Sequence, residues 1–406
     1  MSSEKSGAPA YPMARGCPFS PPAEIGRLRE EEPVAQVRTW DGSLPWLVTR
    51  YDDVRAILSD PRFSSDPGRD GYPVTSAGMK QQHKANPTFI AMDDPEHARH
   101  RRMITGEFSV RRTEALRPTV ERISEELLDA MEASGGTADL VADYALPLTS
   151  TVICELLGIP QEAHTFFQEH SNALLDVKGD PARAGRAVEE LTSYLTELVS
   201  RKLAEPTDDL LGRIVERRVR TGEMTEREVA SLGILLLVAG HETTANQIAL
   251  GVLFLLQNPQ YAAIMRDGDD KEVAAACEEL LRLLTVTHIG RRRVAVEDVE
   301  VNGALIRAGE GVIASGDAAN RDPRQFTDPD LLDIHREQNH HVAFGYGIHQ
   351  CLGQPIARIE LQTAYPAILR RFADLRLAVP LDEIDYRGDM VVYGVHSLPV
   401  AWGEER

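Results

Sequence analysis

An apolar stretch at residues 230–256 constrains the fold of this chain more than any other segment. The stretch is long enough to cross a bilayer as a helix, but polar side chains occupy its centre. They are His241, Glu242, Thr243, Thr244, Asn246 and Gln247. Ionisable side chains in the middle of a membrane span are costly, whereas a buried helix of a globular protein can carry them as a functional site. We therefore predict a buried core helix with a polar working site and no membrane partner.

The charge balance argues against nucleic acid as a partner. The 406 residues include 44 Lys and Arg against 63 Asp and Glu, which gives a net charge of -19 at pH 7. Such a surface repels a phosphate backbone. Hydrophobic residues make up 42% and charged residues 26% of the chain, as in ordinary globular proteins.

The cysteines indicate a reducing compartment. The four of them, at positions 17, 154, 277 and 351, form no CxxC pair and no regular framework. Residues 1–19 are polar and interrupted by proline, without the apolar core of a signal peptide or membrane anchor. We therefore expect a cytoplasmic protein, with Cys154 and Cys277 as core thiols.

Helical patterns dominate the chain after an initial hairpin. Asp41 and Gly42 predict the turn of that β-hairpin, and Asp52 is a candidate cap for a helix that runs to Leu58. Thr225 and Glu228 form a capping box for the long apolar helix. Asp180 and Pro181 open a helix predicted at residues 181–203. Further helices are predicted at residues 113–133, 271–284 and 353–371, and short strands at residues 293–301 and 311–315.

Residues 64–87 are rich in Gly, Pro and Ser and predict a long loop, which we interpret as a substrate lid. We see no repeat and no linker that divides the sequence. The pattern therefore predicts a single α+β domain over residues 1–406, mostly α-helical with small β-sheets.

The most specific segment is Phe344-Gly-Tyr-Gly-Ile-His-Gln-Cys351-Leu-Gly353, directly before a predicted helix. Its glycines, among them Gly345 and Gly347, allow tight turns and a close approach to a flat ligand. Cys351 would lie at a helix N-terminus, where unpaired N–H groups and the helix dipole stabilise a thiolate. A thiolate on haem iron favours cleavage of the O–O bond. A buried structural cysteine is the alternative, and the complete FxGxHxC spacing argues against it.

On this segment, and over nearly its whole length, the chain resembles the cytochrome P450 family. The resemblance implies a helix-rich fold around haem b, with Cys351 as the axial ligand and His349 beside a haem propionate. Phe344, Gly345 and Gly353 belong to the same cofactor-binding loop. The resemblance also implies a monooxygenase that uses dioxygen and two electrons to hydroxylate or epoxidise a small hydrophobic substrate. Polyketides or macrolides, steroids and xenobiotics are the expected classes.

Within the apolar stretch, the segment AGHETT at residues 239–244 matches the oxygen-binding groove of the family. Gly240 would let the helix open locally, so that a freed carbonyl and the Thr243 hydroxyl order water. Glu242 and Thr243 pair an acid with an alcohol, which can relay protons to dioxygen. Thr244 would replace Thr243 if the helix register differs.

Glu279 and Arg282 match the ExxR pair of the family, which Arg336 completes in relatives. At i, i+3 the first two share a helix face, and a buried ion pair of this kind can hold the loop that carries Cys351. The motif has weight because Thr243, Glu279 and Cys351 occur in the order of the family.

Haem propionates need cationic partners. His97 and Arg101, at i, i+4, match the HxxxR site of the family, and Arg293 matches a second propionate arginine. Arg291 and Arg292 are close alternatives to Arg293.

The resemblance also implies where the substrate and the electron donor bind. The expected pocket walls are the lid loop, residues 177–181, Leu236, Ala239, Val286, Ile289 and Val395. Since a GxGxxG nucleotide signature is absent, electrons from NAD(P)H are expected to arrive through a ferredoxin reductase and a ferredoxin. Arg102, Arg111 and Arg358 are the expected docking residues for the ferredoxin.

Two other functions compete with this interpretation. A haem-thiolate peroxygenase or isomerase needs no electron donor, but related peroxygenases typically lack the acid and alcohol found here at Glu242 and Thr243. A haem-based gas sensor would normally bring an output domain, for which the sequence leaves no stretch.

Overall fold

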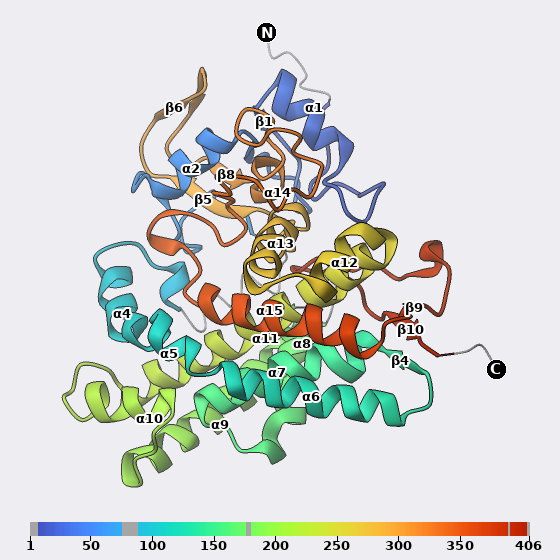
Figure 1. The fold of residues 1–406 in the computed structure, drawn as a ribbon. Helices are drawn as coiled ribbons and strands as arrows, with labels where there is room; N and C mark the ends of the chain where they lie inside the picture. Colours follow the sequence, from blue (N-terminus) through green and yellow to red (C-terminus); the bar gives the residue numbers. More distant parts are fainter. Residues whose placement is uncertain (1–6, 75–87, 176–179, 389, 404–406) are drawn as a thin grey trace. The chain divides into compact units, whose positions relative to one another are not determined.

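The computed structural model describes residues 7–74, 88–175, 180–388 and 390–403. They form two compact units (Figure 1). Unit 1 comprises residues 1–99, 281–331 and 337–351, and unit 2 comprises residues 100–280, 332–336 and 352–406. The prediction of a mostly helical α+β fold with small sheets is confirmed. The single-domain interpretation of residues 1–406 stays a prediction.

Unit 1 is built on a five-stranded sheet with the order β1-β2-β8-β5-β3. Strands β2 and β8 run parallel, and the other neighbours are antiparallel. The strands are β1 (Val34–Gln36), β2 (Trp46–Val48), β3 (Phe63–Ser64), β5 (Arg291–Ala295) and β8 (Gly311–Ala314), with a separate hairpin of β6 (Val299–Val301) and β7 (Ala304–Ile306). Helices α1 (Ala23–Glu31), α2 (Tyr51–Ser59) and α14 (Gly316–Ala319), and 3-10 turns at Phe89–Ala91 and Gly347–His349, complete the unit. Tyr51 and Phe326 pack edge to face in its core.

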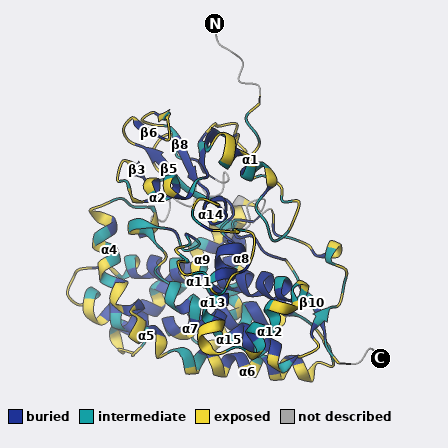
Figure 2. Ribbon diagram, turned by 45° about the horizontal axis from the view of Figure 1, so that its top comes forward, coloured by how far each residue is buried: buried dark blue, intermediate teal, exposed yellow. Residues whose placement is uncertain are grey.

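Unit 2 is a helical assembly around α11 (Glu226–Gln257), which packs against α7, α9 and α15. The other helices are α5 (Val110–Glu114), α6 (Arg117–Ala133), α7 (Leu146–Leu157), α8 (His164–Leu175), α9 (Pro181–Ala204), α10 (Leu210–Ile214), α12 (Pro259–Asp267) and α15 (Gln354–Arg371). A small sheet joins β4 (Thr137–Asp139), β10 (Pro399–Ala401) and β9 (Arg376–Leu377). Most exposed residues of this unit lie on outer helices such as α5 and α6 (Figure 2). Helices α4 (Glu96–Thr105) and α13 (Asp270–Leu283) contain the boundaries between the units.

The long apolar segment is buried, as predicted. Most residues of α11 from Val229 to Leu255 are buried, and its N-terminus carries the predicted capping box of Thr225 and Glu228. Within the described residues, length and hydropathy qualify no single helix as a membrane span, and α11 with α12 qualifies only as a pair bent by 117°.

Most predicted elements are confirmed, with two corrections. The hairpin at Asp41 and Gly42 joins β1 to β2, and Asp180 caps α9 through the Ala182 N–H. The prediction that Asp52 caps a helix was wrong: α2 begins one residue earlier, so Asp52 lies in its first turn. The helix predicted at residues 113–133 is divided, because Pro118 begins a new helix, α6, after α5 has ended. Most of the predicted lid, residues 75–87, lies outside the described residues.

Candidate active site

The loop that carries Cys351 is shaped by its own backbone. Cys351 N donates a hydrogen bond to Phe344 O at 2.8 Å, which closes residues 344–351 into a compact turn. Gly345 and Gly347 have φ values of +77° and +74°, a region that side chains with a Cβ disfavour. A Cβ at Gly347 would also lie 2.4 Å from Leu58 O. The glycines predicted to permit a tight turn are therefore required by it, and Gly353 occupies the N-cap position of α15.

The four cysteines differ in exposure. Cys154 and Cys277 are buried, as predicted, and burial raises the pKa of Cys154 to about 12 and that of Cys277 further. Cys351 and Cys17 are exposed. Cys351 thus combines an accessible sulfur with a rigid loop, as a metal ligand requires.

A partly buried arginine supports this loop from β5. Arg291 Nη2 donates to Ala343 O at 2.7 Å, and a Cβ at Gly345 would lie 2.8 Å from Arg291 Nε. Burial lowers the pKa of Arg291 to about 10, and the charge of Cys351 acts in the opposite direction. Its Nη1 is buried and has no hydrogen-bond partner among the described residues. A buried guanidinium nitrogen without a hydrogen bond, beside an exposed thiol, fits an anionic ligand such as a haem propionate.

Of the predicted propionate residues, His97, Arg293 and His349 belong to unit 1 and Arg101 to unit 2. The rings of His97 and His349 are 4.1 Å apart, and His97 Nδ1 lies 3.2 Å from Asp94 Oδ1. Arg101 follows His97 by one turn on α4. Arg293 is buried on the same face of β5 as Arg291, because alternate strand residues share a face, and burial lowers its pKa too. Arg292, the other alternative, projects from the opposite face.

Helix α11 is continuous through the predicted oxygen-binding segment, so the local opening expected at Gly240 is absent from it. Instead, Thr243 Oγ1 donates to Ala239 O at 2.9 Å, which occupies the carbonyl that we expected to be free. Ala239 is exposed although its helix is mostly buried, and Thr243 and Gly240 are partly exposed beside it. These three residues mark an accessible strip on the helix.

The structure separates the two threonines that the sequence left as alternatives. Thr244 is 5% exposed and hydrogen-bonded to Glu360 of α15. Burial raises the pKa of Glu360 to about 8, an effect that the bond from Thr244 opposes. Thr243 is therefore the hydroxyl on the accessible strip, while Thr244 faces the core.

Glu242 is buried and ion-paired. Its Oε2 lies 2.9 Å from Arg387 Nη1 and 3.1 Å from Asn246 Nδ2. Sequence reasoning missed Arg387 and Glu360, because neither lies in a motif and each meets α11 only through tertiary folding. One signal of such a partner was present in the sequence: an acid at the centre of an uninterrupted apolar helix needs a buried cation beside it.

The ExxR residues support different backbone segments. Glu279 accepts hydrogen bonds from Arg336 Nε at 3.1 Å and Asp333 N at 2.8 Å. Arg282, fully buried, donates to the carbonyls of Asn320, Pro329 and Leu331. The Asn320 side chain in turn accepts from Val342 N at 2.7 Å, two residues before Phe344. Arg282 thus supports, through Asn320, the segment that leads into the Cys351 loop. The role of the ExxR motif in holding the loop stays a prediction.

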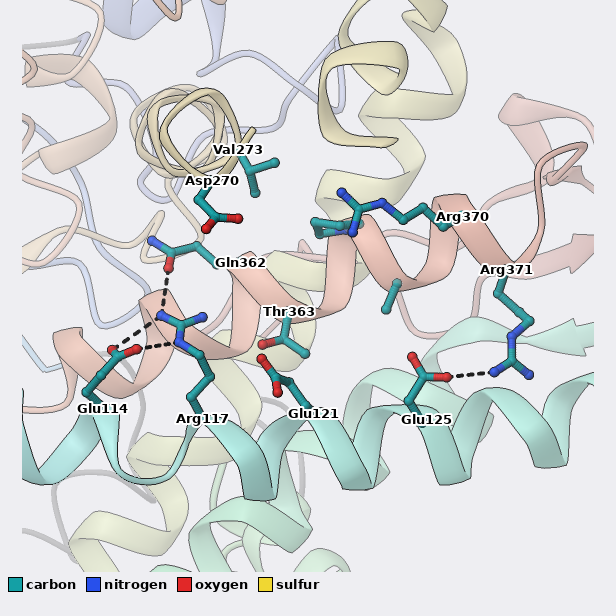
Figure 3. A pocket seen from close by; sticks show the side chains of 12 residues that line it. Glu114, Arg117, Glu121, Glu125, Asp270, Val273, Gln362, Thr363, Arg370 and Arg371 are labelled. Carbon is teal, nitrogen blue, oxygen red and sulfur yellow. Dashed lines mark hydrogen bonds and ion pairs between the residues drawn. The ribbon is translucent and has the colours of Figure 1, made fainter. Parts of the chain in front are cut away.

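The predicted pocket walls are largely buried. Leu236, Val286, Ile289 and Val395 are at most 9% exposed. Residues 177–179 of the expected wall lie outside the described residues. A different cavity of about 850 Å³ lies among α5, α6, α13 and α15 (Figure 3), and Arg117 pairs there with Glu114. Its lining carries acidic and basic side chains that pair with one another, so the cavity indicates no particular ligand.

Comparisons with known proteins agree with this arrangement. The sequence profile described as Cytochrome P450 matches residues 271–380. Cytochrome P450-SU2 of Streptomyces griseolus is 51% identical, with 96% of this chain and 95% of that protein covered. Cytochrome P450 GfsF of Streptomyces halstedii is 49% identical, with 97% and 96% covered. The crystal structure of cytochrome P450 MoxA from Nonomuraea recticatena matches with a TM-score of 0.90 at 44% identity, with 98% and 99% covered. The chain therefore belongs to the cytochrome P450 family of haem-dependent monooxygenases.

Proposed function

We propose that this monooxygenase binds haem through the Cys351 thiolate and oxidises a hydrophobic secondary metabolite or steroid-like molecule. The observation that carries the ligand assignment is the exposed Cys351 in a glycine-shaped loop, beside Arg291, whose buried Nη1 has no hydrogen-bond partner among the described residues. When bound, the haem would supply the reduction of dioxygen and the oxidation of a C–H or C=C bond. His97, Arg101, Arg293 and His349 would hold its propionates, with Arg291 as a further candidate.

The chain itself would supply protons and orientation. Thr243 holds its hydroxyl against Ala239 O on the accessible strip of α11, and Glu242 lies next to it in sequence as the acid. A carboxylate and a hydroxyl can pass protons through water to a reacting oxygen. Ala239 has no side chain beyond Cβ, which leaves room beside that hydroxyl. Thr243 is proposed for the relay, and Thr244 for packing.

The substrate class is inferred from relatives. A vitamin D3 dihydroxylase of Streptomyces griseolus is 44% identical over 98% of this chain. The 20-oxo-5-O-mycaminosyltylactone 23-monooxygenase of Streptomyces fradiae is 43% identical over 97% of it. We propose that the substrate is a macrolide, another polyketide or a steroid-like molecule of comparable size. The binding panel should therefore contain vitamin D3 and macrolide lactones, scored by thermal shift.

A ferredoxin reduced by NAD(P)H through a reductase is the proposed electron donor. Arg102 and Arg111 are exposed, and Val110 beside them is 73% exposed. Arg358 is already paired with Glu278 at 2.7 and 2.9 Å, so its charge attracts an acidic partner less. Arg102→Gln and Arg111→Gln should slow reduction more than Arg358→Gln, whereas Arg186→Gln, at an exposed position on α9, should leave the rate unchanged. The cytoplasmic location stays a prediction.

The absorption spectrum of the dithionite-reduced protein under carbon monoxide tests the proposal. A strongly red-shifted Soret band is expected in the unchanged protein and in Cys17→Ala, which removes the other exposed cysteine. The band should be lost in Cys351→Ala. A band typical of histidine ligation, or an unaltered band in Cys351→Ala, would refute the ligand assignment. Turnover supported by peroxide but never by NADH and ferredoxin would favour the peroxygenase alternative.

A further inference from the structure

A buried ion pair ties the acid of α11 to the C-terminal segment of unit 2. The side chains of Glu242 and Arg387 are 0% and 5% exposed, and Oε2 and Nη1 lie 2.9 Å apart. Asn246 Nδ2 donates to the same oxygen at 3.1 Å and also to Glu242 O at 2.8 Å. A buried charge that loses its partner is strongly unfavourable, so the carboxylate is held where Arg387 lies.

Arg387 is fixed by a hairpin, residues 385–388 and 390–396, which we call the C-terminal hairpin. Arg387 N donates to Gly394 O at 2.9 Å, and Tyr386 and Val395 form an antiparallel bridge. The hairpin backbone lies directly against α11, because a Cβ at Gly394 would be 2.1 Å from Asn246 Oδ1. The rings of Tyr386 and Tyr393 stack at 6.4 Å. The hairpin thus positions Arg387 through backbone contacts.

The pairing leaves one oxygen of Glu242 available. Oε1 has no hydrogen-bond partner among the described residues, and His241 Nε2 lies 3.8 Å away, beyond hydrogen-bond distance. Oε2, in contrast, accepts from both Arg387 and Asn246. Arg387 and Asn246 therefore occupy Oε2, and Oε1 is the oxygen of Glu242 that they leave without a hydrogen bond.

We propose that Arg387 is a positioning residue for oxygen activation: it holds Oε2 so that Oε1 alone accepts and releases the relayed proton. Because the C-terminal hairpin also carries Val395, an expected pocket wall, contact with substrate would be transmitted to the ion pair through the same backbone. In this relay the proton moves between Oε1 and water. This inference rests on the proposed relay role of Glu242.

The test uses dioxygen as its probe and needs no organic substrate. With NADH, a plant-type ferredoxin and its reductase, dioxygen takes up two electrons and two protons to give hydrogen peroxide, or four of each to give water. Forming water requires more protons at the site. We expect the share of water to fall at least threefold in Arg387→Met and in Glu242→Gln, with no further fall in the double variant. Arg387→Lys should retain most of the share, and Arg376→Met, on nearby β9, all of it.

Hydrogen exchange of the C-terminal hairpin gives a readout without turnover. The backbone amides of residues 385–396 should exchange at least tenfold faster in Arg387→Met than in Arg376→Met. Equal exchange rates would overturn the coupling, and an additive loss of water in the double variant would overturn action through Glu242. An unchanged share of water in Glu242→Gln, with the thiolate band intact, would overturn both the inference and the relay. If the unchanged protein, reduced under carbon monoxide, shows no red-shifted Soret band, the proposed function itself is refuted.

Discussion

The Cys351 loop and the centre of α11 are built in opposite ways. In the loop, backbone hydrogen bonds and two positive-φ glycines create an unusual chain path. In α11 the backbone is a regular helix, and side-chain partners create the unusual environment: Arg387 for Glu242 and Glu360 for Thr244. The first site is specified within a few residues, whereas the second depends on segments far along the chain. Substitutions should therefore affect the two in different ways.

The largest expected effect tests whether the Cys351 loop is stable without support from side chains outside it. Arg282→Met removes three hydrogen bonds from a fully buried guanidinium to main-chain carbonyls and weakens the Asn320 link to Val342. We expect a loss of roughly 3–5 kcal/mol in the free energy of unfolding, because the three carbonyls lose a charged donor. Urea unfolding measures it, with Arg307→Met, at an exposed position of unit 1, as the control. A loss equal to the control would mean that the loop needs no support from Arg282.

The next effect concerns the α11 side of the comparison and depends on pH. Glu360 has its pKa raised from 4.5 to about 8, so its contribution to stability is complete below about pH 4.5 and is lost as the pH rises through 8. Glu360→Gln removes this titration. From pH 5 to pH 9 the variant should gain stability relative to the unchanged protein, by roughly 3 kcal/mol.

Thermal unfolding at a series of pH values measures this gain. Glu197→Gln, at an exposed position on α9, is the control for the substitution itself. If the stability of Glu360→Gln and of the unchanged protein varied with pH in parallel, the pKa of Glu360 would not be raised, and water would solvate its carboxyl group.

A smaller effect separates backbone conformation from contact in the Cys351 loop. Gly345 and Gly303 have similar φ values, +77° and +80°, but only Gly345 has a close neighbour, Arg291 Nε at 2.8 Å from a built Cβ. Both alanine variants should lose about 1 kcal/mol from strain. Gly345→Ala should lose roughly 1–2 kcal/mol more and bind less haem, because Arg291 must move. Equal losses of stability for the two variants would show that Arg291 moves away from the new methyl group at no cost.

The same contrast explains what the sequence could predict. The Cys351 loop, the capping box of α11 and the Asp180 cap are local features, in which each residue acts on neighbours a few positions away. They were all predicted. Arg387 and Glu360 were missed because a single arginine or glutamate has no local signature, and only the packing of α15 and the C-terminal hairpin brings them to α11. The alternative between Thr243 and Thr244 stayed open for the same reason: helix orientation is a tertiary property.

The smallest expected effect uses these adjacent threonines as a matched pair. Thr244→Val removes the buried hydrogen bond to Glu360 and should cost about 1–2 kcal/mol of stability. Thr243→Val removes only a bond to Ala239 O within the same helix, so its stability should change by less than about 0.5 kcal/mol. The effects on chemistry should be reversed: Thr243→Val should release more hydrogen peroxide per NADH consumed, and Thr244→Val should resemble the unchanged protein. The opposite outcome would be that Thr244→Val stays folded and releases more hydrogen peroxide per NADH than Thr243→Val. The relay would then pass on the α15 side of the helix, and the accessible strip at Ala239 would have no part in it.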